Sequence, residues 1–74
     1  MSQLVRMDRT GHTVVAEWAP TDPGSVERAA RALEQELADG QIAVVSRGEG
    51  QAEMVRELPP DAPLVILRRP IAGG

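Results

Sequence analysis

Only one stretch of this 74-residue chain has the apolar spacing of an α-helix, and this limits the folds open to it. Val26, Ala30, Leu33 and Leu37 follow one another at intervals of four, three and four residues, which places them on one helical face. A single amphipathic helix buries its apolar face only against another element. Because the other apolar segments have strand-like patterns, the helix is expected to pack on a β-sheet.

The limits of this helix follow from residues with strong positional preferences. Thr21 or Asp22 is suited to be the N-cap, with Pro23 in the first turn, where its missing N–H costs nothing. Ser25 is a second possible cap that would start the helix three residues later. Gly40 is expected to end the helix, because glycine readily adopts the positive φ found just after a helix C-terminus.

The remaining apolar segments predict strands on both sides of the helix. Residues 3–8 and 12–18 form a hairpin around the turn at 8–11, and in the second strand Val14, Ala16 and Trp18 point to one face. Residues 42–46 and 64–67 are apolar on both faces, which suits buried strands. Residues 52–58 predict a weaker edge strand, and the prolines of 59–63 a rigid turn.

This order of elements predicts an α+β fold with one helix packed on a mixed four- or five-stranded sheet. The helix crosses one face of the sheet, and the last strand lies in the middle, parallel to the first. That is a β-grasp arrangement of order ββαβ(β)β. We expect one domain over residues 1–69 and a flexible tail over 70–74.

Composition adds constraints on the core and on the partners. The chain has no cysteine, so a disulfide and a thiol nucleophile are excluded, and Trp18 is its only aromatic residue. We therefore expect an aliphatic core around one ring, with these residues mostly buried: Val14, Trp18, Val26, Ala30, Leu33, Val44, Leu64 and Ile66. The net charge of −3 argues against binding to nucleic acid. No apolar run approaches the roughly 20 residues of a membrane span, and the start does not have the pattern of a signal peptide, so a cytoplasmic protein is expected.

The polar residues do not form a catalytic pattern. His12 is the only histidine and lies beside a turn, where a solvated side chain is the simplest interpretation. The acidic residues lack the spacing of a metal-binding loop. Gly48-Glu49-Gly50 follows a strand without opening a helix, which indicates a hairpin turn and not a phosphate-binding loop. We therefore expect a protein that is not an enzyme and that binds neither metal nor cofactor.

The C-terminal segment is the strongest candidate for a functional site. A buried strand is followed by Arg68 and Arg69, and the sequence then ends in Pro70-Ile71-Ala72-Gly73-Gly74. Glycine gains nothing from packing, but its unhindered carboxylate suits attack on the α-phosphate of ATP. A frayed end is the alternative interpretation of a Gly-Gly terminus taken alone.

The whole chain resembles the ubiquitin-like superfamily in element order, size and ending. Residues 10–18, Thr-Gly-His-Thr-Val-Val-Ala-Glu-Trp, resemble the first hairpin of ubiquitin, and 64–69 followed by Gly73-Gly74 resemble its last strand and tail. The apolar ending 70–74 is most similar to the bacterial sulfur carriers of thiamine and molybdopterin synthesis. Two features depart from ubiquitin: Gly48-Glu49-Gly50 does not suggest its apolar surface patch, and the chain has no lysine, since all eight basic residues are arginine.

The resemblance implies a small carrier protein whose Gly74 carboxylate is adenylated by an E1-like enzyme, which uses ATP, and is converted to a thiocarboxylate. A sulfurtransferase and a sulfur-accepting synthase are the further partners it implies, and the free protein is expected to be a monomer. The candidate partner-binding residues are Arg68, Arg69, Pro70 and Ile71. The end that is activated consists of Gly73 and Gly74. The alternative is a protein modifier joined through Gly74 to target lysines, and a third is a binding module whose tail is incidental. The absence of lysine suits a modifier that is conjugated singly and equally a carrier that avoids acylating itself, but it fits GC-rich coding better.

Overall fold

The chain begins with a hairpin of β1, Ser2–Asp8, and β2, Gly11–Trp18, followed by helix α1, Pro23–Ala38. A second hairpin joins β3, Ile42–Gly48, to β4, Gln51–Val55, and the last strand is β5, Leu64–Arg68. The computed structural model describes residues 1–48 and 50–70. This is the predicted order of elements, with the weaker strand of 52–58 shortened to β4.

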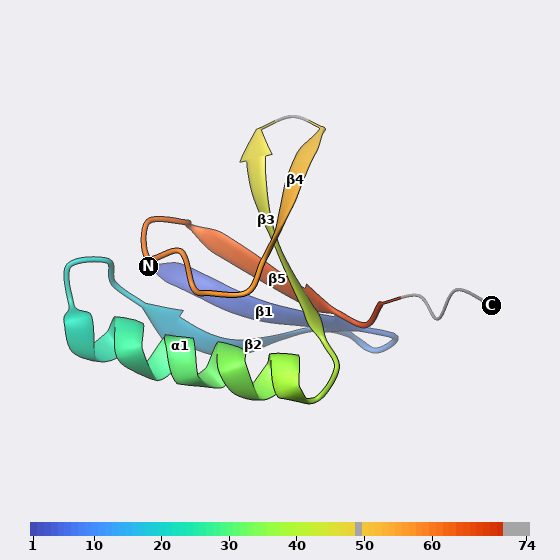
Figure 1. Cartoon of the computed structure of the whole chain (residues 1–74), viewed down its shortest axis with the longest axis horizontal. Coiled ribbons are helices and arrows are strands. Elements are labelled where there is room, and N and C mark those ends of the chain that lie inside the picture. The colour runs from blue at the N-terminus through green and yellow to red at the C-terminus, as the bar shows by residue number, and fades with distance from the viewer. Residues whose placement is uncertain (49, 71–74) are drawn as a thin grey trace.

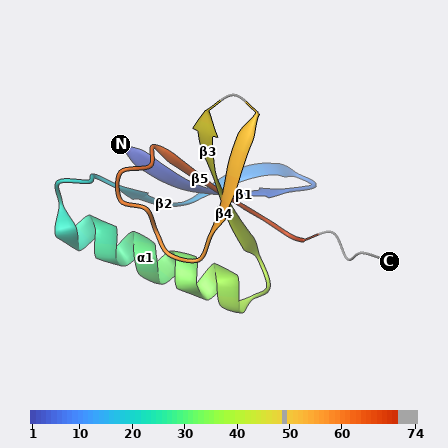
Figure 2. The same cartoon turned by 45° about the horizontal axis from the view of Figure 1, so that its top comes forward.

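All five strands form one mixed sheet in the order β2-β1-β5-β3-β4. β5 lies in the centre, parallel to β1 and antiparallel to β3, while both hairpins are antiparallel. Helix α1 covers one face, and the β3–β4 hairpin extends away from the other strands (Figures 1 and 2). The fold is thus α+β with one helix on a five-stranded sheet, and the predicted central position of the last strand is confirmed.

The ends of α1 follow from the local sequence. Asp22 is the N-cap, its carboxylate accepts a hydrogen bond from the Gly24 N–H at 3.2 Å, and Pro23 occupies the first turn. Ser25 is not the cap: its hydroxyl accepts from the Ala19 N–H at 3.0 Å and bonds the Asp22 carbonyl at 2.9 Å. At the other end, Gly40 has a φ of +94°. The Gly40 N–H donates a hydrogen bond to the Leu37 carbonyl, and the Gln41 N–H donates one to the Glu36 carbonyl. These two bonds form a Schellman motif.

Trp18 is the centre of the core, as predicted. It is fully buried, and its indole N–H donates to the Pro60 carbonyl at 3.0 Å, which fastens the proline-rich turn over the ring. The other members of the core are aliphatic: Leu4, Ala29, Leu33, Ala43, Val45, Ala62, Val65 and Leu67.

The predicted face of the two apolar strands was wrong. β3 buries Ala43 and Val45, and β5 buries Val65 and Leu67, whereas Leu64 is 41% exposed. Val44 and Ile66 are half-buried on the sheet face opposite α1. Because both strands are apolar on both faces, alternation alone does not determine which face meets the helix.

Two further burial predictions need correction. A β-bulge falls in the first hairpin, where Leu4 pairs with Ala16 but Val5 pairs with Val14. The extra residue turns Val14 away from the face of Trp18, and Val14 is 45% exposed. In α1 the buried stripe is rotated by about one residue, so that Ala29 is fully buried while Val26 and Ala30 are half-buried.

Candidate functional site

The C-terminal end of β5 is the part of the predicted site that the structure describes. Arg68, Arg69 and Pro70 are exposed there, at the edge where the parallel strand β1 also ends. The predicted site residues Ile71, Gly73 and Gly74 lie outside the described residues. The topology therefore places two exposed arginines where the chain leaves the middle of the sheet.

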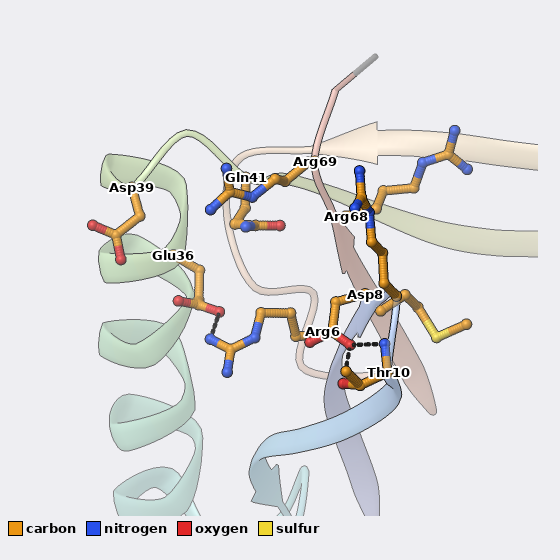
Figure 3. A pocket seen from close by; sticks show the side chains of 10 residues that line it. Arg6, Asp8, Thr10, Glu36, Asp39, Gln41, Arg68 and Arg69 are labelled. Atoms are coloured by element: carbon orange, nitrogen blue, oxygen red, sulfur yellow. Dashed lines mark hydrogen bonds and ion pairs between the residues drawn. The ribbon is translucent and has the colours of Figure 1, made fainter. Parts of the chain in front are cut away.

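A groove of about 990 Å³ lies beside this exit. Its walls are the end of β1 with the β1–β2 turn, the C-terminal end of α1, and the end of β5 (Figure 3). Because β1 and β5 are parallel neighbours, Arg6 pairs with Leu67, and the turn that follows β1 lies next to Arg68. Residues about sixty positions apart in the sequence thus line one hollow.

Two acidic groups in this groove already have partners. Arg6 donates to the Glu36 carboxylate at 2.9 Å, and Glu36 is buried although it lies in the last turns of α1. A cation at this end of a helix is favourable, because the helix dipole is negative there. Asp8 accepts bonds from the Thr10 hydroxyl at 2.6 Å and from the Thr10 N–H at 2.8 Å. These two hydrogen bonds hold the pKa of Asp8 below its ordinary value of 3.8, and the bond from the hydroxyl contributes more than the bond from the N–H.

The other cations of the groove are unpaired. Half of the eight arginines line it, namely Arg6, Arg9, Arg68 and Arg69, in a chain whose net charge is negative. Of these four arginines, only Arg6 has an ion pair within residues 1–48 and 50–70. The second arginine pair of that part of the chain, Arg31 with Glu27 at 2.8 Å, is the pair expected on the outer face of α1. With the carboxylates of Asp8, Glu36 and Asp39 also on its walls, the groove has one positive charge in excess.

Gln41 contributes an unpaired acceptor to the same groove. The turn at Gly40 directs the chain from α1 into β3 and brings Gln41 to the groove wall. The residue is 9% exposed, and its side-chain oxygen Oε1 has no hydrogen-bond partner. Buried carbonyl oxygens are rarely left unbonded, because the lost hydration costs free energy.

A second surface runs across the sheet face opposite α1. Neighbouring strands pair Val14 with Val5, Val5 with Ile66, Ile66 with Val44, and Val44 with Met54. We call these five side chains, one from each strand, the apolar row. Met54 is 62% exposed and Val14 45%, and a shallow hollow of about 310 Å³ opens between Val44, Ala52 and Ile66. The sequence analysis did not predict this row. The strands that are apolar on both faces could have indicated it, because only one of their faces packs against the helix.

Outside the groove and the apolar row, the other candidates named from the sequence stand apart in the described part of the chain. His12 is exposed on β2, across from Met7. Among the described residues, no three histidine, aspartate or glutamate side chains lie close enough together to hold a metal ion. Within that same part of the chain, no helix has the length and hydropathy needed to cross a membrane.

Comparison of the chain with protein-family models, with curated proteins and with solved structures found no match.

Proposed function

We propose that this chain is a β-grasp, ubiquitin-like carrier whose Gly74 carboxylate is adenylated by an E1-like enzyme and converted to a thiocarboxylate for sulfur transfer. The observation that carries the proposal is the central position of β5, parallel to β1. A strand held on both sides anchors the segment after Arg68 firmly to the domain. The sequence of that segment, which ends in Gly73-Gly74, is suited to enter an enzyme's active site.

The chemistry needs nothing from the chain except its terminal carboxylate. A carboxylate oxygen attacks the α-phosphorus of ATP, and pyrophosphate leaves. The outer sulfur of a persulfide then attacks the acyl carbon and AMP leaves. A thiol breaks the resulting acyl disulfide, which releases the thiocarboxylate and leaves a disulfide between the thiol and the persulfide carrier. Glycine leaves the acyl carbon open to attack, and in this scheme the chain is a substrate, not a catalyst.

The apolar row and the neighbouring arginines supply a surface for the activating enzyme. Arg68 is the residue of β5 two positions beyond Ile66, on the same side of the strand, so a cation borders the apolar row at the chain exit. Apolar contact with the row would provide the binding area. Carboxylates of the enzyme would pair with Arg68 and Arg69, because guanidinium groups bind carboxylates in a forked geometry.

The test is the state of the C-terminus in the cells that make the protein. Met1 is 83% exposed and lies at the opposite end of the sheet from the end of β5 (Figure 1), so an N-terminal tag leaves the exit free. The purified chain should contain a fraction heavier by the replacement of one oxygen with sulfur. That fraction should be absent from the variant that lacks Gly73-Gly74. An unmodified mass during active sulfur assimilation would overturn the proposal.

Two substitutions test the docking surface in the same cells. Met54→Glu places a charge in the apolar row and should lower the thiocarboxylated fraction. Gln35→Glu adds the same charge on the exposed outer side of α1 and should leave that fraction unchanged. Equal effects of the two variants would contradict the assignment of the row.

The same preparation distinguishes the modifier alternative. A modifier would form adducts of higher mass, and trypsin would leave residues 69–74 attached to a target lysine, because cleavage after Arg69 is blocked by Pro70. If such remnants are found and no thiocarboxylate is found, the function is conjugation to other proteins and not sulfur transfer.

A further inference from the structure

The groove beside the chain exit has features that docking of an enzyme on the sheet face does not use. Arg9 lies in the turn between β1 and β2, and Gln41 lies between α1 and β3. From these residues, together with Arg68 and Arg69, we infer that the groove is a binding site for a phosphorylated small molecule that also carries a hydroxyl or amine donor.

The charge of the groove supports an anionic ligand. Arg9, Arg68 and Arg69 have no ion pair within the described part of the chain, while Arg6 is paired with Glu36. The lining also holds Asp8, which accepts hydrogen bonds from Thr10 and keeps its negative charge, and Asp39. The lining holds four arginines against the three carboxylates of Asp8, Glu36 and Asp39, which leaves one positive charge in excess on a protein of charge −3. Such local concentration of one charge attracts ligands of the opposite sign.

The arrangement of the arginines favours phosphate over carboxylate. Arg9 belongs to the β1–β2 turn that lines the groove. Arg68 and Arg69 reach the groove from the end of β5 (Figure 3). The two oxygens of a carboxylate lie in one plane and suit one guanidinium fork. A phosphate group presents three oxygens in different directions, so it can accept hydrogen bonds from arginines on separate walls.

Gln41 indicates the second part of the ligand. Its buried Oε1 lacks a donor, and a phosphate group has only acceptors to offer at neutral pH. A ligand hydroxyl or amine beside the phosphate would donate to that oxygen once the amide turns it toward the groove. The volume of about 990 Å³ is large enough for a nucleotide or a sugar phosphate.

The test uses the isolated chain, so its outcome does not depend on the proposed carrier function. Pyrophosphate and AMP are titrated separately into the isotope-labelled protein, and backbone amide shifts are followed by NMR. Both should give saturable shifts confined to the residues around Arg9, Gln41 and Arg68. Arg9→Gln should weaken both ligands about tenfold, the loss of one charged hydrogen-bonding partner. Arg28→Gln removes the same charge from the exposed side of α1 and should change neither affinity.

Gln41→Leu tests the donor part of the inference. It should weaken AMP several-fold and leave pyrophosphate unchanged, a difference that altered folding would not produce. The inference is overturned by shifts that do not saturate, by equal losses in Arg9→Gln and Arg28→Gln, or by a loss of both ligands in Gln41→Leu. Tighter binding of an acidic peptide than of pyrophosphate, with the same residues shifted, would identify a protein partner instead.

Discussion

Replacing Leu67 and Leu64 separately by alanine tests which face of β5 meets the helix. The two substitutions remove the same atoms from one strand, but Leu67 is fully buried in the core, whereas Leu64 is 41% exposed on the opposite face. Leu67→Ala should cost about 3–5 kcal/mol, because it removes buried surface and leaves an enclosed cavity. Leu64→Ala should cost about 1 kcal/mol, because two-fifths of the residue is already in water and no cavity forms.

The size of this difference makes the test decisive. A domain of 74 residues has a total stability of about 4–11 kcal/mol, so Leu67→Ala removes a large share of it. Urea unfolding followed by Trp18 fluorescence measures both free energies, since the only aromatic ring is fully buried and becomes exposed on unfolding. Equal costs, or a larger cost for Leu64→Ala, would refute the assignment of the two faces.

Three further predictions concern α1 and the first turn. Leu33→Ala, at the buried centre of α1, should lower the free energy of unfolding by about 3 kcal/mol in the same urea assay, and a loss under 1 kcal/mol would contradict its core position. Asp22→Ala should cost about 1 kcal/mol through loss of the N-cap bond, and a variant as stable as the parent would show that the cap contributes nothing. Thr10→Val should raise the pKa of Asp8 toward 3.8, as measured by NMR titration of the carboxyl. Because that pKa is lowered in the folded state, its contribution to stability is present above pH 3.8 and is lost as the pH falls through the lowered value. The variant should lose part of this dependence, because the bond from the backbone N–H of residue 10 remains, and an unchanged Asp8 titration would mean that the Thr10 hydroxyl is not the leading cause.

The element order was predictable because its signals are local. Asp22 and Pro23 begin α1, Gly40 ends it with a positive φ, and the turn at Gly11 also needs a positive φ. The central place of β5 followed from a strand that is apolar on both faces and needs neighbours on both sides. Each of these features depends on a few adjacent residues, so tertiary contacts did not override them.

The face of each strand was not predictable in the same way. In β5 either Leu64 and Ile66 or Val65 and Leu67 satisfy the alternation, and only packing against α1 selects the second pair. In β2 the bulge beside Val14 inserts one residue, and nothing in the local sequence marks its position. A slip of one residue reverses every side chain beyond it.

The candidate site was predicted in part. Arg68 and Arg69 were selected from the sequence, and the structure exposes both at the end of the central strand. The groove itself was missed, because it forms only when the parallel pairing of β1 and β5 brings the β1–β2 turn beside that end. Since the parallel pairing was itself predicted, Arg6 and Arg9 were within reach of the same reasoning.

The most direct test of the central claim is the mass of the C-terminal tryptic peptide, residues 69–74, from protein isolated in its own cells. The intact mass alone is ambiguous, because oxidation of any of the three methionines adds nearly the same mass as replacing oxygen by sulfur. This peptide contains no methionine, so the ambiguity disappears. We predict a peptide that is heavier by the sulfur-for-oxygen exchange and that reacts with iodoacetamide at its terminus. A peptide found only with an ordinary, unreactive carboxylate would contradict the account.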